Sequence, residues 1–123
     1  NNLRGFFWQL YDKGHELVSH TWTPREGFLE LCSQMDIGMQ CSFSETFNIV
    51  GADLVSQGVP IVTSSEIPWH APWFSAEPTE SDQIFTALKR AYGLPRLNTD
   101  LNQLGLRLYT NKTRKIWLNY FKD

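Results

Sequence analysis

The chain has 123 residues, with 11 basic and 13 acidic side chains, a formal net charge of −2 and 41% hydrophobic residues. This length suits one domain with a core of its own and is short for two. No apolar run approaches the roughly 18 residues of a membrane span, and no leader of basic, apolar and small residues indicates secretion. Cys32 and Cys41 are too few for a disulfide framework.

Charge is distributed unevenly along the chain. Residues 1–88 carry 3 basic and 11 acidic side chains, a balance of −8, whereas residues 89–123 carry 8 basic and 2 acidic ones, a balance of +6. A basic end attracts phosphorylated ligands, anionic lipid or nucleic acid, or else folds back on the acidic part as a solvated helix face. No nucleic-acid-binding signature accompanies it, so we expect no nucleic-acid partner. Contact with a membrane surface through the basic C-terminal helix is an open alternative.

The first half of the chain alternates between helical and strand patterns. Apolar residues at three- and four-residue steps predict helices, and short apolar runs between turn residues predict strands. In chain order these elements are a helix over 3–14, a strand over 15–20, a helix from Pro24 to about 35, a strand over 37–41, a helix over 47–58 and a strand over 59–63.

This β-α-β-α-β order predicts an α/β fold with a mostly parallel sheet of three to four strands flanked by helices. Ligands of such sheets gather beyond the carboxyl ends of the strands. Those ends are the loops over 21–24, 42–48 and 64–68, which are therefore the first candidates for a functional site.

The second half has a different character. Residues 67–78 are too rich in proline for a regular element, and their Trp69 and Trp73 form either a sugar-stacking platform or a plug at one edge of the core. A weak capping box predicts a helix over 79–93. Asn98 or Thr99 is a candidate cap for a final helix that runs to about residue 121, which gives the chain a helical C-terminus.

Glu45 and Asp53 are the most informative polar residues. Glu45 lies in the loop after the strand over 37–41, and Asp53 lies eight positions later in the following helix. The backbone N–H groups of Phe47, Asn48 and Ile49 open that helix, and such a terminus suits an anionic phosphate. Nearby carboxylates accept hydrogen bonds from the hydroxyls of a sugar or ribose. Together these features would make a nucleotide-sugar site, but the residues alone favour the plainer interpretation of two ordinary helix acids.

The stretch from Ser42 to Val62 resembles the donor-binding signature of retaining glycosyltransferases with the GT-B fold, of the family 4 type. That signature is Ser-x-x-Glu-x-Phe-Gly, a pair of Glu residues eight positions apart, and Gly-x-Pro-Val-Val. The likeness covers residues 15–65, including Glu16–Phe28 and the Met35–Ile37 start of a strand. The matching positions of the signature are Ser42, Glu45, Phe47, Gly58, Pro60, Ile61 and Val62.

The resemblance implies a role for each matching residue. Glu45 would hold hydroxyls of the transferred hexose, and Asp53 would hold the ribose hydroxyls. The backbone amides of Phe47, Asn48 and Ile49 would contact the sugar and the diphosphate, while Thr21 and Trp22, in the loop after His20, would border the base. Two positions depart from the family pattern: Asp53 replaces a Glu, and Asn48 replaces a Gly.

The resemblance also predicts a single partial Rossmann-like donor-binding domain over 1–123, with its core at 15–65 and C-terminal helices over 79–121. It implies a cytoplasmic, metal-independent transferase without a cofactor, whose nucleotide-sugar is its substrate. The chain begins with Asn rather than Met, and the family's acceptor domain and diphosphate-binding Lys and Arg have no counterpart here. We therefore expect the isolated chain not to transfer sugar.

Two further expectations follow from this interpretation. The strand over 15–20 would lack its usual neighbours, which predicts rearranged strand pairing, a homo-oligomer that closes the sheet, or a missing N-terminal half. The alternative function is a non-catalytic α/β assembly or binding module derived from the same scaffold. The three histidines lack metal-ligand spacing, so no metal site is expected.

Overall fold

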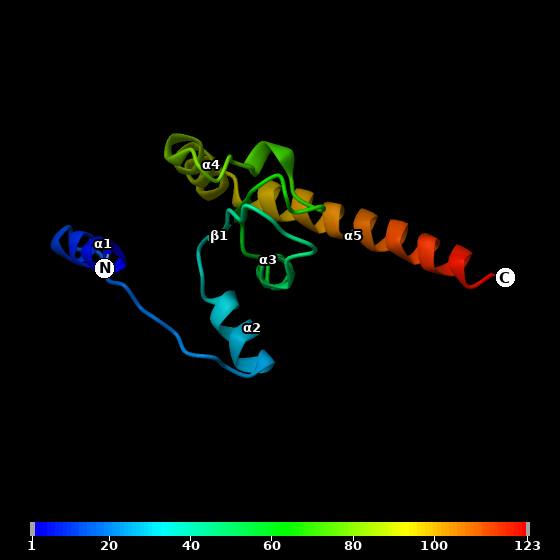
Figure 1. Cartoon of the computed structure of the whole chain (residues 1–123), viewed down its shortest axis with the longest axis horizontal. Coiled ribbons are helices and arrows are strands. Elements are labelled where there is room, and N and C mark those ends of the chain that lie inside the picture. The colour runs from blue at the N-terminus through cyan, green and yellow to red at the C-terminus, as the bar shows by residue number, and fades with distance from the viewer. Residues whose placement is uncertain (1, 123) are drawn as a thin grey trace.

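The computed structural model describes residues 2–122 and has a mixed α/β fold with a helical C-terminus (Figure 1). The predicted helices are all present. In chain order the elements are α1 (Asn2–Asp12), α2 (Arg25–Ser33), β1 (Gly38–Gln40), α3 (Ile49–Ser56), β2 (Ile61–Thr63), the 3-10 helix η1 (Pro72–Phe74), α4 (Ser81–Gly93) and α5 (Pro95–Tyr120).

The sheet has two parallel strands, not the three to four that the sequence predicts. β1 pairs with β2 in the register Gly38↔Ile61, and α3 is the crossover between them. Within residues 2–122, the sheet is extended only by an isolated parallel bridge between Thr63 and Ser75. A β-α-β unit is therefore present. No further strand pairs along the full length of either outer edge within residues 2–122.

The prediction of a strand over 15–20 is wrong. Every side chain of this segment is exposed, and the backbone runs as an irregular link between α1 and α2. Leu17 and Val18 are its consecutive apolar residues, and on a strand they would point to opposite faces. Because neither face would then be apolar, the segment has nothing to bury against a sheet.

The core lies on both faces of β2. Ile61 points to one face and Val62 to the other, as the two-residue period of a strand requires, and both are buried. On the first face lie Cys32, Leu54, Val55, Val59, Ile67 and Trp69, and on the second lie Ala71, Phe74, Ala76, Ala87 and Ala91. A strand that is buried on both faces is typical of parallel α/β packing.

The start of α5 differs from the prediction. Neither Asn98 nor Thr99 caps this helix, because it begins at Pro95, whose fixed φ and missing N–H suit a first helical position. Asn98 instead lies one turn inside the helix, fully buried. Its Oδ1 accepts from the Ile61 N–H and its Nδ2 donates to the Ile61 carbonyl, both at 2.8 Å. Asn98, which resembles a cap in the sequence, therefore satisfies the backbone N–H and C=O of Ile61 at the edge of β2 that faces away from β1.

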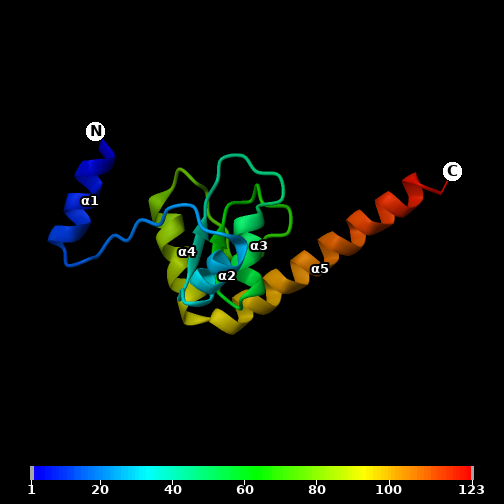
Figure 2. The same ribbon diagram turned by 90° about the horizontal axis from the view of Figure 1, so that it is seen from below.

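The two ends of the chain extend away from this domain. In both views α1 lies apart from the domain on one side, and the C-terminal half of α5 projects from the other (Figures 1 and 2). None of the helices within residues 2–122 combines the length and the apolar character needed to cross a membrane.

Candidate functional site

The loop after β1 fixes Glu45 beside the N-terminus of α3. The Ser42 hydroxyl donates to Glu45 Oε1 at 3.1 Å, and the Asn48 carboxamide donates to the same oxygen at 2.8 Å. Among the residues whose side chains the structure describes, 5 and 8–122, no hydrogen bond engages the other oxygen, Oε2. The carboxylate is therefore held by one oxygen and presents the other as a free acceptor.

Asn48 is the residue that organises this loop. Its backbone is left-handed, with φ of 62°, the only positive φ of a non-glycine residue within 2–122. Its Oδ1 accepts from the Gly51 N–H at 2.6 Å, which caps α3, while its Nδ2 also donates to Gln40. Gly and Asn are the residues that adopt this conformation at least cost, which is a physical reason for an Asn at this position.

These residues line a cavity of about 310 Å³ at the N-terminus of α3, which we call the Glu45 pocket. Its walls are Gln40, Glu45, Thr46, Phe47, Asn48, Ile49 and Val50. Four of the seven predicted site residues therefore lie together: Glu45, Phe47, Asn48 and Ile49.

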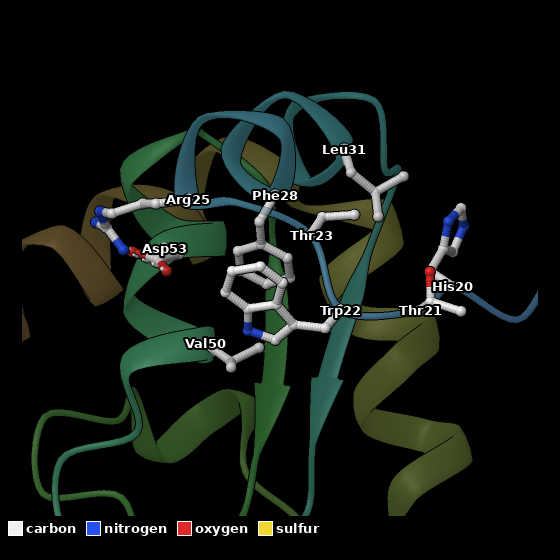
Figure 3. Close-up of a pocket in the computed structure, with 9 residues that line it drawn as sticks. All are labelled: His20, Thr21, Trp22, Thr23, Arg25, Phe28, Leu31, Val50 and Asp53. Atoms are coloured by element: carbon white, nitrogen blue, oxygen red, sulfur yellow. Dashed lines mark hydrogen bonds and ion pairs between the residues drawn. The ribbon is translucent and has the colours of Figure 1, made fainter.

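The other three predicted residues, Thr21, Trp22 and Asp53, lie in a second cavity of about 480 Å³, the Trp22 pocket (Figure 3). In this view Trp22, Phe28 and Val50 occupy the centre, Arg25 and Asp53 lie to one side, and His20 and Thr21 to the other. Thr23 and Leu31 complete its lining.

An ion pair closes one side of the Trp22 pocket. The Arg25 guanidinium donates to both carboxylate oxygens of Asp53, at 2.9 and 3.1 Å, and the Asp53 side chain is 8% exposed against 65% for the Arg25 side chain. The hydrogen bond and the charge of Asp53 raise the pKa of Arg25. Burial, aided by the charge of Asp53, raises the pKa of the nearby Cys32 thiol.

The two pockets adjoin each other along α3. Val50 lines both of them, so the Glu45 pocket lies at the helix N-terminus and the Trp22 pocket lies along its side. Glu45 and Asp53 consequently belong to neighbouring cavities rather than to one. Sequence reasoning missed Arg25 and Phe28; the signal for Arg25 was its position as an isolated cation in the acidic half of the chain.

The idea of a Trp69–Trp73 sugar platform is wrong. Trp69 is buried in the core at 2% exposure, and its Nε1 donates to the Phe47 carbonyl at 2.6 Å. Trp69 therefore helps to hold the loop between β1 and α3, which carries Glu45. Trp73 is half-exposed, and its ring is covered by the Arg90 guanidinium, 5.0 Å from the ring centroid.

A scan against protein-family models finds no match for the chain, and searches of curated proteins and of solved structures find none either. Among residues 2–122, no group of three His, Cys, Asp or Glu side chains is placed to hold a metal ion.

Proposed function

We propose that this chain is a Rossmann-like donor-binding part of a glycosyltransferase, with the two adjoining pockets as its nucleotide-sugar site. The observation that carries the proposal is the placement of Glu45. Two neighbours fix its carboxylate at the mouth of a β-α connection, and one oxygen stays free to accept a hydrogen bond. A sugar hydroxyl is the donor that such a carboxylate suits.

The Glu45 pocket takes the sugar and the diphosphate in this proposal. α3 begins at Ile49, so the N–H groups of Ile49 and Val50 are first-turn donors at the positive end of the helix dipole. Such donors favour a diphosphate, and Glu45 lies beside them to accept hydroxyls of the hexose.

The Trp22 pocket takes the nucleoside. The indole of Trp22 and the ring of Phe28 offer aromatic surface to a base, and the Asp53 carboxylate is an acceptor for the ribose hydroxyls. Because Arg25 occupies both oxygens of Asp53, the ribose would compete with this guanidinium for them.

Calorimetric titration of the 123-residue protein with a panel of nucleotide-sugars, UDP-glucose and GDP-mannose among them, tests the proposal. We expect one member to bind and Glu45→Ala to weaken it by roughly 10- to 100-fold, because a hydrogen bond to a charged group is lost. The matched control is Glu66→Ala, an exposed acid in the loop after β2. Binding that no panel member shows, or that Glu45→Ala leaves unchanged, contradicts the proposal.

The open edge of β1 favours the alternative, a non-catalytic assembly module. Within residues 2–122 this strand pairs with β2 alone, and its Met39 side chain is half-exposed. An unpaired edge is a template for a strand of another chain. Light scattering that shows tight self-association, together with no nucleotide-sugar binding, supports this alternative.

A further inference from the structure

The projecting end of α5 is amphipathic. We call residues 107–122 the C-terminal arm. At 3.6 residues per turn, Tyr109, Thr113, Ile116, Trp117, Tyr120 and Phe121 fall on one side of the arm. The other side carries Arg107, Lys112, Arg114, Lys115 and Lys122, interrupted by Leu108 and Leu118, and residues 107–122 contain no acidic side chain.

Only the beginning of the apolar side is covered by the domain. Tyr109 packs against Phe47, with ring centroids 5.4 Å apart. Farther along, Trp117 and Phe121 are 55% and 73% exposed, and their rings stack on each other at 5.6 Å, with Tyr120 edge-on to both. The three rings belong to the last residues of the arm, and the C-terminal end of α5 lies clear of the domain in both views (Figures 1 and 2).

We propose that the C-terminal arm binds the surface of an anionic phospholipid membrane. Its aromatic cluster would enter the headgroup region, while its cations would meet the lipid phosphates. A cationic polar face opposite an apolar face with Trp is the pattern of helices that lie in a membrane interface. Trp and Tyr favour that depth because one end of the side chain is apolar and the other is polar.

Charge complementarity favours lipid over a second copy of the arm. Five cations without an acid would repel the same five cations on a neighbouring helix. An anionic leaflet instead attracts each Lys or Arg near its surface. The long stems of Lys and Arg also let their charges stay at the phosphates while the helix settles deeper. This inference is independent of the nucleotide-sugar proposal, because the arm does not line either pocket.

Co-sedimentation of the 123-residue protein with vesicles tests the inference. The probes are vesicles of phosphatidylcholine alone and vesicles with 30% phosphatidylglycerol, the latter at low and at high salt. We expect the protein to pellet with the anionic vesicles at low salt and to be released by salt. Replacing Lys112, Arg114 and Lys115 with Gln should weaken binding roughly 100-fold, from about fivefold per cation.

The aromatic arm variant combines Trp117→Ser with Phe121→Ser, and we expect it to weaken binding at least about 10-fold through the lost apolar contact. Two controls match these variants. Replacing Lys13, Lys89 and Arg96 with Gln removes three exposed cations outside the arm. Phe85→Ser combined with Tyr92→Ser removes two exposed aromatic rings of α4. Circular dichroism checks that every variant is folded.

The inference is overturned by equal retention on neutral vesicles, or by controls that lose as much binding as the arm variants. Two other results also overturn it, each in favour of a different partner. Self-association that the arm variants abolish, without vesicle binding, would assign the arm to a second copy. Retention on RNA but not on vesicles would assign it to a nucleic acid.

Discussion

Asn98 replaces a neighbouring strand for Ile61. In a parallel ladder the N–H and C=O of one residue point to the same side, and those of Ile61 point away from β1. The carboxamide of Asn98 receives this N–H and donates to this C=O, both at 2.8 Å, and Asn102 Nδ2 donates to Asn98 Oδ1 at 2.9 Å. One polar side chain of α5 thus satisfies the backbone hydrogen-bonding groups of a buried strand edge and holds the helix against the sheet.

Removal of this side chain should destabilise the domain severely. Asn98→Ala leaves a buried N–H and a buried C=O without partners, and we expect it to cost about 3 kcal/mol or more of unfolding free energy. Asn111→Ala, on the exposed part of the same helix, is the control and should change stability by less than about 0.5 kcal/mol. Urea unfolding followed by circular dichroism measures both. Equal midpoints would show that Asn98 does not support β2.

Gly105 allows α5 to approach the backbone of Trp69. A Cβ at this position would overlap the Trp69 carbonyl oxygen, so Gly105→Ala should destabilise by about 2 kcal/mol as helix and loop move apart. Gly27→Ala is the matched change, because a Cβ there meets nothing within 4 Å and alanine favours the helix. We expect thermal unfolding midpoints to shift in opposite directions for the two variants.

The left-handed conformation of Asn48 distinguishes two small substitutions. Glycine adopts φ of 62° freely, whereas alanine costs about 1 kcal/mol there. Asn48→Ala should therefore be less stable than Asn48→Gly by about that amount, as measured by urea unfolding. Both remove the hydrogen bond to Glu45, so both should weaken nucleotide-sugar binding equally. An alanine variant as stable as the glycine variant would contradict the assigned conformation.

Removing Arg25 and removing Asp53 should have different effects on nucleotide binding if the ribose contacts Asp53. Arg25→Ala frees both carboxylate oxygens, so the affinity for UDP or GDP should stay the same or rise. Asp53→Ala removes the acceptor, and binding should fall by roughly 10-fold or more. Calorimetry measures the nucleotide affinity of both variants. A loss of affinity in Arg25→Ala alone would assign the ribose contact to Arg25 instead of Asp53.

The two cysteines should resist alkylation at neutral pH. Burial raises the pKa of both thiols, so the reactive thiolate is scarcer than in a free cysteine and increases only at higher pH. Cys41 is half-buried and Cys32 is buried, so iodoacetamide should modify Cys41 first. Mass spectrometry of timed samples at pH 7.5 and 9 follows this order. Equal rates in the native protein and in urea would contradict it.

The helices and the β1-α3-β2 connection could be predicted because their signals are local. Apolar spacing and the turn at Gly58 mark α3, and the apolar run over 59–63 marks β2. The segment over 15–20 could not be predicted by the same means, because whether it forms a strand depends on a partner elsewhere. Asn98 was misinterpreted as a cap for a similar reason, since its partner, Ile61, lies 37 residues away.

The candidate site shows the same division between local and distant contacts. The motif around Glu45 predicted four residues that line one pocket, because they lie within a single loop and helix start. The adjoining pocket brings together Trp22, Phe28 and Asp53 from separate parts of the chain. Spacing in the sequence gave no measure of these contacts, and so the ion pair of Asp53 with Arg25 was not anticipated.

The irregular link over 13–24 has a consequence for the handling of this protein. It joins α1 to the domain without a strand, and nearly all its side chains are exposed. Exposed irregular backbone is where proteases cut first. Trypsin should therefore cleave after Lys13 and release α1, leaving a shortened fragment that keeps the sheet and both pockets.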